Sequence, residues 1–104
     1  LEKLGMPSEL VMRHRTPQFG HVFSGDGYSA GYYSYLWADA LTSDAAEAFT
    51  EGEGYYDRDV ANAYMEHVLS AGNRMDAADA WMAFRGREVD TAALMRARGF
   101  PVTQ

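Results

Sequence analysis

The sequence of 104 residues contains no cysteine, which excludes disulfide scaffolds, cysteine-based zinc or iron–sulfur sites and thiol catalysis. Basic residues are also scarce, with nine Lys and Arg against 15 Asp and Glu. The resulting net charge of −6 weighs against nucleic acid as a partner, because phosphate binding relies on clustered Lys and Arg. No apolar run approaches the ~18 residues of a membrane span, so we expect no membrane partner.

The overall composition is that of a globular protein, with 47% hydrophobic and 23% charged residues. The length fits one small domain. The first residue is Leu1 rather than Met, and we expect the chain to be cut from a longer protein. The compartment stays open between cytoplasm and periplasm, because any targeting segment would precede Leu1.

The pattern of apolar residues predicts an all-α fold. A long helix rich in Tyr, Ala, Leu and Trp is expected over about residues 29–50, although Gly31 inside it costs ~1 kcal/mol relative to Ala. Three short helices should follow. Their candidate N-caps are Asp57 or Asp59 for the first helix, Asn73 or Asp76 for the second, and Asp90 for the third.

The N-terminal quarter is aperiodic and interrupted by prolines. We expect residues 1–27 to form an irregular segment that ends in a glycine-rich loop, and residues 28–104 to be helical. In that loop, Gly25 and Gly27 bracket Asp26 and permit positive φ at either end.

Tyr28, Tyr32 and Tyr35 are spaced i, i+4 and i+7, so a helix would align them along one face. Two interpretations stay open. The tyrosines are buried core residues with satisfied hydroxyl groups, or they are hydroxyl donors that line a cleft. A phenol can donate a hydrogen bond to a developing oxyanion, which makes the second interpretation a catalytic one.

Metal-binding patterns are absent from the sequence. No two histidines are spaced i, i+4. His21, which precedes the glycine loop, is an isolated histidine, and such a residue is more often a structural hydrogen-bonding residue than a metal ligand. The acidic residues of the long helix are expected to form a solvated face: Asp39, Asp44, Glu47 and Glu51.

The Tyr-rich segment resembles part of a known protein family. Residues 21–38, HVFSGDGYSAGYYSYLWA, resemble the zinc metallopeptidase family of thimet oligopeptidase, oligopeptidase A and peptidyl-dipeptidase, with bacterial peptidyl-dipeptidases looking most similar. The stretches 69–73 (LSAGN), 84–87 (FRGR) and 98–100 (RGF) resemble the C-terminal end of the same family. The resemblance therefore covers roughly residues 13–100.

The resemblance implies an all-helical hydrolase of short peptides, in which a His-Glu-x-x-His motif and a further glutamate hold zinc. Tyr35 and Tyr28 would then be catalytic donors to the oxyanion, and His21 and Tyr28 would contact substrate. Tyr32 would be an accessory substrate contact, and Gly25 and Gly27 would be hinge points of a mobile loop. The choice between release of C-terminal dipeptides and internal cleavage is not implied.

The zinc motif itself is missing from this sequence. We therefore expect residues 1–104 to be a C-terminal helical subdomain of a larger metallopeptidase, inactive without the missing N-terminal part. Exposed aromatic residues favour self-association through Tyr32, Tyr33 and Trp37. The alternative is a free-standing helical module that binds a peptide or partner through an aromatic face, or a purely structural cap.

Overall fold

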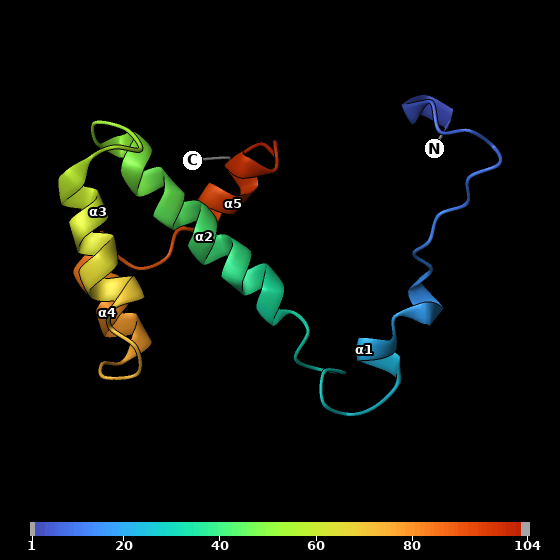
Figure 1. Ribbon diagram of the computed structural model, residues 1–104, viewed down its shortest axis with the longest axis horizontal. Helices are drawn as coiled ribbons and strands as arrows, with labels where there is room; N and C mark the ends of the chain where they lie inside the picture. The colour runs from blue at the N-terminus through green and yellow to red at the C-terminus, as the bar shows by residue number, and fades with distance from the viewer. Residues whose placement is uncertain (1, 103–104) are drawn as a thin grey trace. The chain divides into compact units, whose positions relative to one another are not determined.

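The computed structural model describes residues 2–102, which are helical and contain no strand (Figure 1). This confirms the predicted all-α class. The chain divides into two compact units, one ending at Ser34 and one beginning at Tyr35. None of the helices in the described part of the chain is both long and apolar enough to cross a membrane.

The first unit contains short helical segments joined by irregular chain. Two single 3₁₀ turns, η1 (Glu2–Leu4) and η2 (Thr16–Gln18), precede the short helix α1 (Gly20–Phe23). A turn over residues 27–33 then leads to α2.

The second unit is built on α2 (Ser34–Glu51), its longest helix. It continues with α3 (Arg58–Tyr64), which runs on into the π-helical turn η3 (Met65–Leu69), and with α4 (Ala77–Arg85) and α5 (Thr91–Ala97). In Figure 1, α3 and α4 lie on one side of α2 and α5 lies on the other. The three short helices that follow the long one are as predicted.

The N-caps of the short helices are aspartates. Asp57 accepts hydrogen bonds from the amides of Asp59 and Val60, so Asp57 rather than Asp59 begins α3. Asp76 caps α4, and Asp90 caps α5 through the amide of Ala92. These short polar side chains satisfy backbone N–H groups that have no partner inside the helix.

The start of α2 differs from the prediction. The helix begins at Ser34 rather than near residue 29, so Tyr28 and Tyr32 do not share a continuous helix with Tyr35. Residues 27–33 instead form turns, in which the carbonyl of Tyr28 accepts from the amides of both Gly31 and Tyr32. Gly31 explains why α2 begins later than predicted, because glycine loses more backbone entropy than other residues when it becomes helical.

The expected solvated acidic face of α2 is wrong for Asp44, whereas the side chains of Asp39 and Glu51 remain more than half exposed. Asp44 is fully buried, and each acidic side chain of this face pairs with an arginine from the C-terminal third of the chain. The pairs are Asp39 with Arg98, Asp44 with Arg85 and Arg87, Glu47 with Arg96, and Glu51 with Arg85. These ion pairs fix α4, α5 and their connection to α2.

The core of the second unit is small. Among the described residues, its buried apolar side chains are all alanines, namely Ala40, Ala45, Ala48 and Ala93. A chain of aromatic rings supplements them: Tyr64 contacts Phe84 with ring centroids 5.3 Å apart, and Trp81 contacts Phe84 at 5.8 Å. Many large apolar side chains in this unit therefore stay exposed.

Candidate functional site

Four aromatic side chains gather in the first unit. The ring of Tyr32 lies 4.6 Å from that of Phe19 and 5.6 Å from that of His21, measured between centroids. Tyr28 lies 6.0 Å from His21 and 6.2 Å from Tyr32, with the two tyrosine rings nearly perpendicular. Edge-to-face contacts at these distances are favourable, because the positive edge of one ring meets the negative face of the other. We call these four residues the His–Tyr cluster.

The backbone explains how the His–Tyr cluster forms. α1 places His21 one residue after Gly20, and the carbonyl of Phe19 accepts from the amides of Val22 and Phe23. On the other side of the loop, the hydrogen bond from the Tyr32 amide to the Tyr28 carbonyl brings the two tyrosines to the same side of one turn. Three predicted site residues, His21, Tyr28 and Tyr32, therefore lie together.

The glycines of the connecting loop behave differently from the prediction. Neither Gly25 nor Gly27 has a positive φ, and a Cβ atom built on either meets no atom within 4 Å. The described conformation therefore does not require glycine at these positions. A hinge role for them rests on another conformation of the loop.

Tyr35, the remaining predicted catalytic residue, belongs to the second unit. It lies in the first turn of α2 with 68% of its surface exposed. The phenol of Tyr28 is similarly open, at 58%. Within the described residues, both side chains are therefore open to solvent.

An ion-pair network anchors α2 at its centre. Arg87 donates two hydrogen bonds to Asp44, at 2.6 and 2.8 Å, and the Nε of Arg85 donates to it at 3.0 Å. The amide of Asp90 donates to Asp44 at 2.7 Å, and the other nitrogens of Arg85 reach Glu51. Burial raises the pKa of Asp44, but the hydrogen bonds from Arg87, Asp90 and Arg85 outweigh it and hold that pKa below its usual 3.8.

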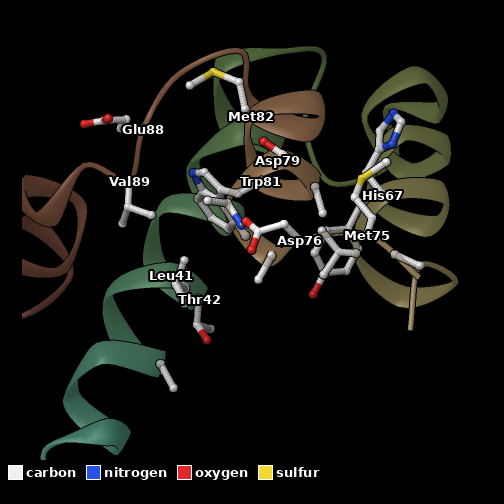
Figure 2. Close-up of a pocket in the computed structure, with 18 of the residues that line it drawn as sticks. Leu41, Thr42, His67, Met75, Asp76, Asp79, Trp81, Met82, Glu88 and Val89 are labelled. Carbon is white, nitrogen blue, oxygen red and sulfur yellow. The ribbon is translucent and has the colours of Figure 1, made fainter. Parts of the chain in front are cut away.

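A groove runs along the second unit beside α2. It has a volume of about 1160 Å³ and is lined mainly by apolar side chains from α2, η3 and α4, with Glu88 and Val89 beyond them. Figure 2 shows Trp81 in this groove, with Leu41 and Val89 near it. We call it the α2–α4 groove. The indole N–H of Trp81 is buried and has no hydrogen-bond acceptor in the part of the chain that the structure describes.

The described residues offer no metal site. Within residues 2–102, no group of three or more His, Asp or Glu side chains lies close enough to hold a metal ion.

Comparison with known proteins identifies the family of this chain. The model of Peptidase family M3 matches residues 2–100. The chain therefore belongs to peptidase family M3, which confirms the resemblance carried by the Tyr-rich segment.

The relatives include two kinds of bacterial enzyme. Oligopeptidase A of Escherichia coli is 43% identical over 81 residues, which are 78% of this chain and 12% of the relative. Dipeptidyl carboxypeptidase of Salmonella typhimurium is 35% identical over 98 residues, which are 94% of this chain and 14% of the relative. The chain thus spans about one seventh or less of the length of these relatives. No solved structure matches it.

Sequence reasoning missed two features of these sites. Phe19 belongs to the His–Tyr cluster, and its position two residues before His21 was the available signal. The Asp44 network was also missed, because Arg85 and Arg87 are more than 40 residues away in sequence. Its signal was the concentration of arginines near the C-terminus, which matches the acids of α2.

Proposed function

We propose that this chain supplies the substrate-binding and oxyanion-stabilising part of a zinc-dependent peptidase that hydrolyses short peptides. The observation that carries the proposal is the His–Tyr cluster, in which His21, Tyr28 and Tyr32 lie within 5.6–6.2 Å of one another. Membership of peptidase family M3 supports the reaction class.

Each residue has a distinct role in this proposal. Tyr35 and Tyr28 donate hydrogen bonds to the oxyanion that forms when the peptide carbonyl is attacked, and preorganised donors of this kind stabilise the transition state. His21 and Tyr28 contact the substrate backbone, and Tyr32 adds an accessory contact. Gly25 and Gly27 let the loop close over bound peptide, in the manner of other mobile active-site loops.

Zinc would be bound by residues outside this chain. The described residues contain no set of metal ligands, and we expect the 104-residue chain to be inactive alone. The chain instead needs the remaining part of the peptidase, and its own contribution is to position the substrate and the developing negative charge.

Release of C-terminal dipeptides is the activity that we favour. Two relatives that span almost the whole chain are named dipeptidyl carboxypeptidase. Such specificity needs a cation for the free carboxylate of the substrate, and Arg13 and Arg15 are exposed candidates in the first unit. A peptidase of this kind should cleave a peptide with a free C-terminus and spare its amidated form.

The test is Tyr35→Phe in the longer peptidase that contains this chain. Loss of one oxyanion donor should lower kcat by about 10²–10³ with little change in KM, because the interaction forms mainly in the transition state. Tyr56→Phe is the matched control, since Tyr56 is 98% exposed and outside the His–Tyr cluster. A Tyr35→Phe enzyme with near-normal kcat would contradict the assignment.

A further inference from the structure

The α2–α4 groove has the chemistry of a docking site. Its lining brings both tryptophans of the chain, Trp37 and Trp81, together with Leu41, Val68 and Val89. Trp37 is 54% exposed, and its neighbours in α2, Tyr35 and Leu36, are exposed as well. A helix with apolar side chains on most faces is normally covered by more polypeptide than this unit supplies.

The edge of the groove is negatively charged. Asp79 and Glu88 line it, and both are exposed without a hydrogen bond or ion pair from their carboxylates among residues 2–102. The acids of α2 are different, because Asp39, Asp44, Glu47 and Glu51 are all neutralised by arginines. In Figure 2 the Glu88 side chain lies at the margin of the groove and points away from Trp81.

We infer that the α2–α4 groove binds an amphipathic helix with an apolar face flanked by Lys or Arg, and that this helix belongs to the longer peptidase. The inference rests on the proposed function, because it assigns the occupant to polypeptide outside these 104 residues. The apolar face covers Trp37 and Trp81, and the flanking cations pair with Asp79 and Glu88.

A second copy of the chain is the competing occupant, as expected from the exposed aromatic residues. Charge disfavours it at this groove, because each copy carries a net charge of −6 and would bring more carboxylates to an acidic edge. Charge complementarity therefore favours a basic helix.

The 104-residue chain can be tested directly with a synthetic peptide. The probe is a helix of about 14 residues, roughly 21 Å long, with Leu on one face and Lys on the others. Trp37 and Trp81 are the only tryptophans and both line the groove, so Trp emission reports its occupancy. We expect a saturable blue shift that weakens with added salt, and no binding of the same peptide with Glu in place of Lys.

Matched variants locate the binding. Ala38→Arg places a bulky cation in the groove, whereas Ala46→Arg makes the same change at an exposed α2 position outside it. The first should raise the dissociation constant at least about tenfold and the second should leave it unchanged. The double variant Asp79→Asn, Glu88→Gln should weaken binding and reduce its salt dependence. Equal binding by both arginine variants, or equal binding of the Lys and Glu peptides, would overturn the inference.

Two further measurements separate the sources of the occupant. If Trp emission shifts with chain concentration alone and sedimentation shows a dimer, a second copy fills the groove and the inference fails. In the longer peptidase, Ala38→Arg should lower the thermal midpoint and Ala46→Arg should not; equal midpoints would also overturn it. The Tyr35→Phe test does not involve the groove, so failure of the inference and failure of the proposed function give different results.

Discussion

Asp44 lies at the centre of the ion-pair network of the second unit. Its carboxylate is fully buried and receives hydrogen bonds from Arg85, Arg87 and the amide of Asp90. The Arg85 side chain is itself only 5% exposed. Removing one partner of such a pair leaves an uncompensated buried charge, which costs far more than the intact pair contributes.

Asp44→Asn should therefore lower the free energy of unfolding by about 3–5 kcal/mol, the usual cost of breaking a buried pair. Urea denaturation followed by circular dichroism measures this change. Asp39→Asn is the control, because its ion pair with Arg98 is exposed on both sides and should contribute less than about 1 kcal/mol. Similar effects of the two substitutions would show that burial of Asp44 does not decide its contribution.

The helix caps, Asp44 and the His–Tyr cluster show which structural features the sequence predicts and which it does not. The caps Asp57, Asp76 and Asp90 could be found, because a cap and its helix are adjacent in sequence. Asp44 could not, since its spacing on α2 resembles that of exposed acids and its partners are distant. Of the candidate site, the grouping of His21, Tyr28 and Tyr32 was predicted through the resemblance, whereas their turn conformation was not.

At the scale of elements, two glycines at the two ends of α2 are expected to respond in opposite ways to alanine. A Cβ on Gly31 meets no atom within 4 Å, and its φ is not positive. Gly31→Ala should extend α2 toward residue 29 and stabilise the chain by about 0.5–1 kcal/mol. Greater helicity by circular dichroism together with a higher urea midpoint would confirm this expectation.

Gly52→Ala should have the opposite effect. A Cβ there overlaps the carboxylate of Asp57, which caps α3 and also accepts from the amide of Glu53. Asp57 would have to give up part of this arrangement, and overpacking of this kind costs about 1–3 kcal/mol. A stability equal to that of Gly31→Ala would mean that the turn after α2 adjusts freely.

The glycine loop before α2 gives a test of mobility rather than stability. Because Gly25 and Gly27 lie in open space without positive φ, the double alanine variant should keep the helicity and the urea midpoint of the chain. In the longer peptidase, it should lower kcat/KM if loop closure needs another backbone conformation. Full activity with an unchanged fold would remove the hinge role from our proposal.

At the scale of the whole molecule, ion pairs between helices supplement a small apolar core. The buried apolar residues of the described chain are four alanines, while α2 forms a series of carboxylate–arginine pairs with α4, α5 and the residues that follow them. Stability should therefore depend strongly on the ionisation of these carboxyl groups. The direction of this dependence follows from their pKa values.

Acid should unfold the chain. Hydrogen bonds from Arg85 lower the pKa of Glu51 from 4.5, and hydrogen bonds from the Ala92 amide and Arg96 lower that of Asp90 from 3.8, as the Asp44 network does for Asp44. The unfolded chain therefore takes up these protons at a higher pH than the folded chain does. The stabilisation is complete above the unfolded values and is lost as the pH falls through the lowered folded ones.

The free energy of unfolding should accordingly be nearly constant from about pH 7 to 5 and fall steeply below about pH 4. Urea titrations at each pH, followed by circular dichroism, measure this profile. In Asp44→Asn the profile should be shallower, since one of the four carboxyl groups with a lowered pKa is gone (Asp44, Glu51, Asp57 and Asp90), whereas Asp39→Asn should keep the steep fall. A stability independent of pH down to about pH 3 would mean that the arginine pairs do not hold α4 and α5 to α2 in solution.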